Sequence, residues 1–264
     1  MNRSSQRARD GYDDSGAVAL VTGAGRGIGR AVAARLCRAG MRVALSARSK
    51  EQLEETAAGC LGPTLVLPRD LTEPGAPDEL VAEITRFWGP VEVLVANAGA
   101  GVSSRVEKTS DADWQRMLDI NLTAPFRCLR AVVPPMRQVG AGRIVVIASI
   151  AAKVGEPYIS AYTASKHGVL GLVRSAAAEL ASTGVTVNAI CPGYVDTSMT
   201  DATVAGIVAM TGRSEDDARG ILAAKQPTGR LVSPEEVADA VWMCVTNPSV
   251  NGQGINVDGG AVQS

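Results

Sequence analysis

Tyr162 and Lys166 stand four residues apart in the segment Tyr-Thr-Ala-Ser-Lys, and Ser149 precedes the tyrosine by thirteen residues. Residues i and i+4 share one face of a helix, so the lysine ammonium can lie beside the phenol. A neighbouring cation favours the phenolate and lowers the tyrosine pKa from its usual value of about 10. With a serine hydroxyl close by, the three side chains would move a proton to or from a substrate oxygen. The spacing alone is common, and a tyrosine that anchors a helix beside a solvated lysine would also produce it.

Alternating apolar segments and helical patterns predict the elements that must bring these side chains together. We expect strands at residues 17–22, 42–46, 64–67, 93–96, 144–147, 185–190 and 254–257. We expect helices at residues 28–39, 51–58, 79–87, 111–137 and 160–181, and a last helix capped by Ser233 with Pro234 in its first turn. The helix at 111–137 is expected to be irregular near Pro134 and Pro135, because proline cannot donate to a helical carbonyl.

Near-continuous strands of Val, Ile and Leu that alternate with helices indicate a parallel sheet covered on both faces. The predicted fold class is α/β: a single-domain, Rossmann-like, doubly wound parallel sheet of about seven strands, over residues 16–264. Residues 1–15 are rich in Arg, Ser and Asp, and we expect them to form a flexible tail. Ligands bind such sheets beyond the carboxyl ends of the strands, where Ser149 falls.

A glycine-rich turn follows the first expected strand and opens the first expected helix, with Gly23, Gly27 and Gly29 in the segment Thr22–Gly29. Glycines let the backbone turn tightly and approach a pyrophosphate, which the helix N-terminus then binds. A tight strand-to-helix turn without a ligand is the alternative. The chain has no Gly-Lys-Ser or Gly-Lys-Thr after this turn, which argues against a nucleoside triphosphatase.

The residues after the second expected strand bear on which dinucleotide binds. Ala47 stands where an acidic residue would grip a ribose 2′-hydroxyl, and Arg48 follows it. Arg48 and Arg26 can pair with a 2′-phosphate through charge-assisted hydrogen bonds. Two arginines without a carboxylate therefore favour NADP(H) over NAD(H).

Composition narrows the classes of function. The 264 residues carry a net charge of −1, which gives no electrostatic footprint for nucleic acid or for an anionic membrane. No apolar run reaches the roughly 18 residues of a membrane span, and residues 1–15 lack the apolar segment of a secretory signal. One histidine and five scattered cysteines form no zinc pattern, so no metal site is expected. The cysteines are expected to be reduced thiols in or near the core, which fits a cytoplasmic protein.

With these residues in place, the chain resembles the short-chain dehydrogenase/reductase family over about residues 16–262. Thr22–Gly29 is similar to the family's cofactor loop. The other matching positions are Asp70-Leu71 for the adenine-binding pair, Asn97-Ala-Gly99 for the fourth-strand motif, Asn121, Ser149, Tyr162 and Lys166 for the catalytic tetrad, and Pro192-Gly193 with Val195 and Thr197 for the segment that holds the nicotinamide carboxamide. The family usually has another asparagine where Ala96 stands, so loss of a structural hydrogen bond is expected there.

The resemblance implies a role for each member of the tetrad. Tyr162 would protonate a carbonyl oxygen as hydride arrives from the nicotinamide, and Ser149 would orient that oxygen and stabilise its charge. Lys166 would lower the tyrosine pKa and bind the ribose hydroxyls, and Asn121 would support a water chain. The resemblance and the motifs together give the cofactor-binding set Gly23, Arg26, Gly27, Ile28, Gly29, Arg48, Asp70, Leu71, Asn97, Tyr162, Lys166, Pro192, Gly193, Val195 and Thr197.

Among family members the chain looks most like 3-oxoacyl reductases, including aromatic polyketide ketoreductases, with some likeness to 3-hydroxybutyrate dehydrogenases. The expected function is NADPH-dependent reduction of a ketone, a 3-oxoacyl thioester or polyketide-like carbonyl, to a secondary alcohol. The alternatives are an NAD(P)+-dependent secondary-alcohol or 3-hydroxyacid dehydrogenase and, from another class, a non-catalytic dinucleotide-sensing protein. Gly140 and Thr183 stand where acyl-carrier-protein reductases often have arginines, which weakens a dedicated fatty-acid role.

Residues 194–232 are long for a connection, and we expect them to form a mobile lid that determines specificity. Glu156 and Tyr158 could line the substrate pocket, although simple loop packing explains them equally well. His167 adjoins Lys166, but the i+1 position points elsewhere on a helix, so no catalytic role is expected. Small residues on the helix at 160–181 permit close packing on a partner, and the family resemblance implies a homo-oligomer, a dimer or tetramer.

Overall fold

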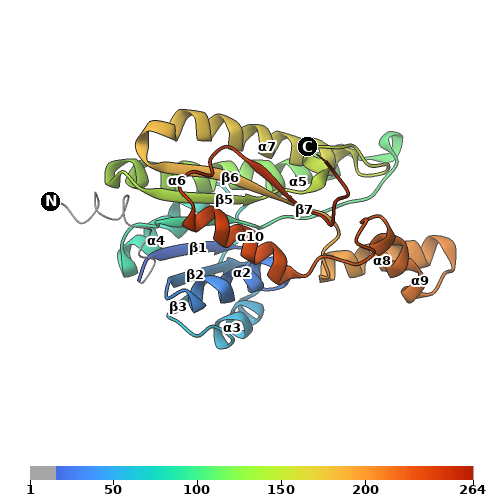
Figure 1. Ribbon diagram of the computed structural model, residues 1–264, viewed down its shortest axis with the longest axis horizontal. Helices are drawn as coiled ribbons and strands as arrows, with labels where there is room; N and C mark the ends of the chain where they lie inside the picture. The colour runs from blue at the N-terminus through green and yellow to red at the C-terminus, as the bar shows by residue number, and fades with distance from the viewer. Residues whose placement is uncertain (1–15, 264) are drawn as a thin grey trace.

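The computed structural model describes residues 16–263; the expected tail at 1–15 and Ser264 lie outside the described residues. Within them, seven strands form one parallel sheet in the order β3-β2-β1-β4-β5-β6-β7 (Figure 1). The strands are β1 Val18–Thr22, β2 Arg42–Ala47, β3 Thr64–Pro68, β4 Val93–Ala96, β5 Gly142–Ile147, β6 Val185–Pro192 and β7 Gly254–Val257. The predicted α/β fold class and the expected strands are confirmed.

Helices cover both faces of this sheet. They are α2 Gly27–Arg38, α3 Lys50–Ala58, α4 Ala76–Trp88, α5 Asp111–Leu118, α6 Ala124–Val139, α7 Ser160–Leu180, α8 Ser198–Thr211, α9 Glu215–Ala224 and α10 Pro234–Thr246. Helices α2 and α10 pack side by side on one face (Figure 1), where α3 joins them. Helices α4, α6 and α7 pack on the other face.

Alternation along the strands builds a separate core on each face. In β1, Val18 and Leu20 join the core under α4, α6 and α7, whereas Ala19 and Val21 join the core under α2, α3 and α10. All four side chains are at most 1% exposed. Successive strand side chains point to opposite faces, so a strand buried on both faces is apolar at most of its positions.

The sheet has a switch point between β1 and β4. From β1 the chain adds β2 and β3 on one side, then returns to place β4, β5, β6 and β7 on the other. In open parallel sheets the crevice for a ligand opens at this point, beyond the carboxyl ends of the strands. The ends of β1, β4, β5 and β6 therefore position the site.

The expected irregularity near Pro134 and Pro135 is wrong. Both prolines lie inside α6, which continues to Val139 and ends at Gly140 with a left-handed φ of 76°. The interruption lies earlier, where Asp119–Thr123 form a π-helical segment between α5 and α6. Such segments mark places where tertiary contacts override helical geometry, and here Asn121 makes those contacts.

Residues 194–232 are more ordered than a plain connection, because they contain α8 and α9. Ser214 caps α9 by accepting a hydrogen bond from the Asp217 amide at 3.1 Å, as its sequence indicates. Ser233 caps α10 in a capping box with Glu236. Figure 1 shows α8 and α9 standing apart from the sheet and its helices.

Candidate active site

The four tetrad positions come from three segments of the chain near the carboxyl ends of β4 and β5. Ser149 follows β5, Tyr162 and Lys166 lie on the first turns of α7, and Asn121 lies in the π-helical segment. A hydrogen bond joins the hydroxyls of Ser149 and Tyr162. Lys166 Nζ lies 5.6 Å from the centroid of the Tyr162 ring. The structure therefore brings together the serine, tyrosine and lysine that the sequence singled out.

Asn121 holds a backbone segment beside these groups. Its Oδ1 accepts a hydrogen bond from the Ala100 amide at 3.1 Å, and its Nδ2 donates to the Ala100 carbonyl at 2.9 Å. Nδ2 also lies 3.2 Å from Ser165 Oγ, which donates to the Tyr162 carbonyl at 2.7 Å. A Cβ added to Gly99 would lie 2.9 Å from Asn121 Oδ1 and 3.7 Å from Lys166 Nζ. The asparagine thus couples the β4 end to the turn of α7 that carries Tyr162.

Burial governs the electrostatics of the tetrad. It raises the pKa of Tyr162, while the hydrogen bond with Ser149 acts in the opposite direction. Burial also lowers the pKa of Lys166 to about 8, and its Nζ donates to the Ile147 carbonyl at 2.9 Å. The net direction of the Tyr162 pKa is upward, because removing the phenolate from water outweighs favourable contacts; a lowering of this pKa by Lys166 stays a prediction.

The glycine loop has the geometry that a dinucleotide pyrophosphate needs. Gly23 and Gly27 adopt left-handed φ values of 63° and 51°, which favour glycine. Helix α2 begins directly after Arg26, and no side-chain hydrogen bond caps its first turn. Its amide donors therefore face the loop without a protein cap, as an anion site requires. The residues present fit a dinucleotide.

Asn97 braces this loop from the end of β4. Its amide and that of Ala98 both donate to Thr22 Oγ1 at 3.0 Å. Its Nδ2 donates to the carbonyls of Thr22 at 2.9 Å and Gly23 at 3.1 Å. These hydrogen bonds give Asn97 a structural role: it joins the end of β4 to the start of the glycine loop.

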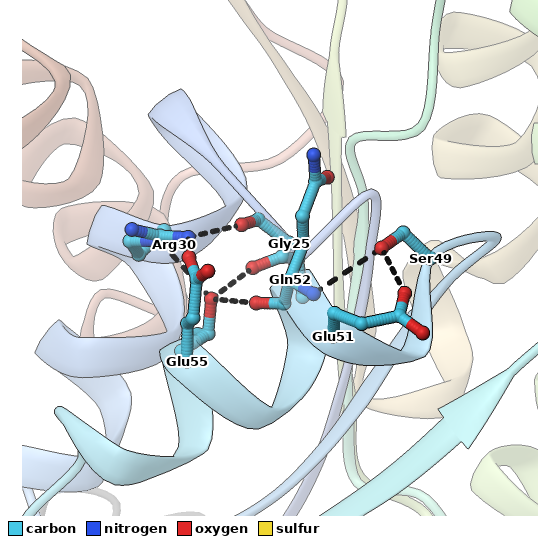
Figure 2. Close-up of polar contacts among 8 residues, drawn as sticks. Gly25, Arg30, Ser49, Glu51, Gln52 and Glu55 are labelled. Atoms are coloured by element: carbon cyan, nitrogen blue, oxygen red, sulfur yellow. Dashed lines mark hydrogen bonds and ion pairs between the residues drawn. The ribbon is translucent and has the colours of Figure 1, made fainter.

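A second brace was missed by sequence reasoning. Figure 2 shows Arg30 of α2 reaching toward Gly25 and α3: its NH2 group donates to the Gly25 carbonyl at 2.6 Å and to Glu55 Oε2 at 2.9 Å. Its Nε donates to Thr56 Oγ1 at 3.1 Å, and Thr56 donates to the Ala24 carbonyl. Arg30 is thus committed to holding the loop on α3. An arginine directly after the last glycine of such a loop carries no signal that separates this role from phosphate binding.

Arg26 and Arg48 lie differently from Arg30. Both are exposed, and neither forms an ion pair within residues 16–263. Arg48 follows β2, and its charge contributes to lowering the pKa of Asp70, which follows β3. The larger causes of that lowering are hydrogen bonds from the Thr72 hydroxyl at 2.7 Å and the Thr72 amide at 3.0 Å. The structure therefore places one fixed carboxylate and one arginine at neighbouring strand ends.

The segment after β6 closes the other side of the crevice. Thr197 packs against the glycine loop: a Cβ added to Gly27 would lie only 3.0 Å from Thr197 Cγ2. Val195 is 5% exposed and pairs with Val232 through an isolated parallel bridge. Gly193 leaves room for Gln226, whose Oε1 would lie only 2.3 Å from an added Cβ.

The structure also shows the contacts of three further residues near the tetrad, Glu156, Tyr158 and His167. Glu156 accepts a hydrogen bond from the Tyr194 hydroxyl at 2.9 Å. Tyr158 is 59% exposed with a left-handed φ of 70°, and its carbonyl accepts from the Ser104 amide. His167 is exposed, with Nδ1 3.0 Å from the Thr163 carbonyl of its own helix.

The model of the short chain dehydrogenase family matches residues 17–207. The chain belongs to the short-chain dehydrogenase family. This member is 38% identical over 254 residues to a putative ketoacyl reductase of Streptomyces coelicolor, covering 92% of this chain and 96% of the relative. It is 33% identical over 251 residues to a D-beta-hydroxybutyrate dehydrogenase of Rhizobium meliloti, covering 92% and 97%.

Among solved structures, this short-chain dehydrogenase is similar to a variant of actinorhodin polyketide ketoreductase crystallised with NADPH. The TM-score is 0.88 at 38% sequence identity, over 94% of this chain and 98% of the other. The family, the Rossmann-like fold and the class of oxidoreductase acting on CH–OH and carbonyl groups are thereby confirmed. Among the described residues, no helix is both long and apolar enough to cross a bilayer.

Proposed function

We propose that this short-chain dehydrogenase uses NADPH to reduce a ketone, a 3-oxoacyl thioester or a polyketide-like carbonyl, to a secondary alcohol. The observation that carries the proposal is the Tyr162 hydroxyl, bonded to Ser149 and raised in pKa by burial. A raised pKa keeps the phenol protonated at neutral pH, which suits a group that donates a proton to a carbonyl oxygen. The names of the reductase relatives favour the direction of reduction.

The tetrad residues divide the chemistry between them. Bound NADPH supplies the hydride. Tyr162 gives its proton to the carbonyl oxygen, and the Ser149 hydroxyl donates a hydrogen bond that orients the same oxygen. Lys166, with its pKa of about 8, is largely cationic at neutral pH and stabilises the phenolate left behind. Asn121 acts as a positioning residue, because its carboxamide contacts Ala100 and Ser165; a water chain at this residue stays a prediction.

The preference for NADPH over NADH rests on Arg26 and Arg48. Both guanidinium groups are exposed, and the strand ends that flank Arg48 are where the adenosine ribose lies in this fold. Each can form charge-assisted hydrogen bonds with a 2′-phosphate. Ala47 offers no carboxylate to repel that phosphate. The solved relative crystallised with NADPH supports the same assignment.

The substrate class comes from the relatives. The names of the putative ketoacyl reductase, the hydroxybutyrate dehydrogenase and the polyketide ketoreductase all describe carbonyl or hydroxyl chemistry on acyl or polyketide chains. Gly140 and Thr183 present no cation for an acidic carrier protein. A CoA thioester, a polyketide or a free ketone therefore fits better than a dedicated acyl-carrier-protein substrate, with residues 194–232 as the lid that selects it.

We also propose a cytoplasmic homo-oligomer, a dimer or tetramer. Trp114 of α5 and Phe126 of α6 are 42% and 43% exposed, and Gly171 of α7 faces open space. Large apolar side chains beside a helix with small residues suit a subunit contact. The five cysteines are unpaired, as expected for a reducing compartment.

The direct test mixes the purified protein with NADPH and acetoacetyl-CoA and follows NADPH absorbance. Parallel reactions use a bicyclic ketone in place of the thioester, NADH in place of NADPH, and 3-hydroxybutyryl-CoA with NADP+. We expect NADPH oxidation with at least one ketone, faster than NADH oxidation and faster near neutral pH than the reverse reaction. No NADPH consumption with either ketone would refute the proposal. Faster alcohol oxidation would favour the dehydrogenase alternative.

A further inference from the structure

Three polar side chains from distant segments meet beside Tyr162. Glu156 lies between Ser149 and α7, Tyr194 follows β6, and Lys225 caps the C-terminus of α9. The Tyr194 hydroxyl donates to Glu156 Oε2 at 2.9 Å and accepts from Lys225 Nζ at 3.0 Å. Lys225 Nζ lies 3.7 Å from Glu156 Oε2. A phenol can donate and accept at once, so Tyr194 joins the carboxylate to the ammonium.

This cluster reaches the reaction centre. Tyr194 and Glu156 both act on the Tyr162 hydroxyl, and each contributes to raising its pKa. Glu156 belongs to the segment that connects Ser149 to Tyr162. A contact that shifts its carboxylate therefore also shifts the backbone between these two tetrad residues. Lys225 stands at the C-terminal end of α9.

Helices α8 and α9 have a core of their own. Val204, Ala218 and Leu222 are at most 4% exposed and pack together. Tyr194 packs against this small core, and Figure 1 shows both helices apart from the sheet. Their attachment to the remaining chain therefore depends on a few contacts, because the small core does not merge with the two cores of the sheet.

Tyr194 is also the backbone anchor of this unit. Gln226 is 1% exposed; its Oε1 accepts from the Tyr194 amide at 3.1 Å, and its Nε2 donates to the Tyr194 carbonyl at 3.2 Å. These buried bonds fix the end of α9 to the end of β6. The half-exposed contact of Lys225 with Tyr194 and Glu156 lies at the same end of α9 but reaches the wall that carries Tyr162.

We propose that Glu156, Tyr194 and Lys225 form a latch that holds α8 and α9 closed across the substrate entrance. They are positioning residues: the latch sets how tightly the site retains substrate, and the tetrad performs the proton transfer. An ammonium, a phenol and a carboxylate in one chain give directional hydrogen bonds, which define one closed position better than apolar contact does. Solvent at the exposed end keeps the latch weak enough to open in each turnover.

The test measures lid motion and kinetics separately, since the kinetic part rests on the proposed carbonyl reduction. Lys225→Met removes the charge and the donors but keeps the length, Tyr194→Phe removes the shared hydroxyl, and Lys225→Arg keeps the cation. Lys50→Met is the matched control, because Lys50 forms an exposed ion pair with Glu54 at 3.5 Å within α3. Hydrogen–deuterium exchange of residues 198–224 needs no substrate.

We expect Lys225→Met and Tyr194→Phe to speed exchange in residues 198–224 severalfold, and Lys225→Arg and Lys50→Met to leave it unchanged. KM should rise roughly 3- to 10-fold in the first two variants, as for loss of a partly exposed charged contact, while kcat and NADPH affinity of Lys225→Met stay within about twofold of wild type. The double variant should match the single ones, since both changes break one latch. Unchanged exchange in both single variants would overturn the latch even if the enzyme reduces ketones. Faster exchange with unchanged KM would overturn its role in retaining substrate.

Discussion

Gly29 offers the sharpest test of how the glycine loop is built. It lies in the first turn of α2, and a Cβ added there would lie 2.2 Å from the Gly23 carbonyl oxygen and 2.6 Å from Asn97 Nδ2. Real Cβ atoms essentially never approach other heavy atoms within 3.0 Å. Gly29→Ala must therefore push apart the helix and the loop, and it must break the hydrogen bonds by which Asn97 holds the Thr22 and Gly23 carbonyls.

The magnitude follows from these contacts. Overpacking a rigid site costs about 1–3 kcal/mol, and each lost hydrogen bond of Asn97 adds about 1 kcal/mol. We expect the free energy of unfolding to fall by about 3–5 kcal/mol, and Tm to fall by roughly 2–4 °C per kcal/mol in a chain of this size. Displacing the loop amides by about 1 Å should also weaken NADPH binding by one to two orders of magnitude.

Denaturant titration measures the stability change, and NADPH fluorescence titration measures Kd. Gly59→Ala is the matched control: Gly59 ends α3 with right-handed φ −85°, and an added Cβ would lie an ordinary 3.6 Å from the Thr56 carbonyl. We expect the control to bind NADPH as the wild type does. If Gly29→Ala unfolds at the wild-type denaturant concentration and keeps the wild-type Kd, the loop is not packed as described.

Three further outcomes follow from the site. Arg48→Ala should raise the Kd for NADPH about tenfold or more while the Kd for NADH stays unchanged, since only the 2′-phosphate loses a charged partner; an equal loss for both cofactors would contradict the assignment. The kcat for reduction should fall above about pH 8, because Lys166 has a pKa of about 8 and loses its charge as the pH rises through that value. A kcat that stays constant to about pH 10, where a free lysine titrates, would count against the role of Lys166. Thr22→Val should lower the free energy of unfolding by about 1–3 kcal/mol in denaturant titrations, because the amides of Asn97 and Ala98 lose their shared acceptor.

The strands were predictable because a parallel strand buried on both faces is apolar at most positions. Val93–Ala96 and residues 144–147 read as short apolar runs and form β4 and most of β5 in the structure. Helical spacing predicted only that Tyr162 and Lys166 share a face; the resemblance to the short-chain dehydrogenase family joined Asn121 and Ser149 to them as a tetrad. Local pattern was also sufficient for the helix cap at Ser233.

Features that depend on distant contacts escaped the sequence. The π-helical segment at Asp119–Thr123 accompanies the bonds from Asn121 to Ala100, which join residues 21 positions apart. The latch joins Glu156 to Tyr194, 38 positions apart. The direction of the Tyr162 pKa depends on burial, which a four-residue spacing cannot reveal. In each case the interaction involves residues far apart in the sequence, which come into contact only in the folded chain.

The central claim is that Tyr162 donates the proton to the substrate oxygen. The decisive measurement is the single-turnover rate of hydride transfer in Tyr162→Phe with saturating NADPH and ketone, beside an NADPH fluorescence titration of the same variant. Loss of a positioned general acid should slow the step about 10²- to 10⁴-fold, while the Kd for NADPH stays within severalfold of wild type. A variant that binds NADPH normally and transfers hydride at a near-wild-type rate would show that another group protonates the substrate.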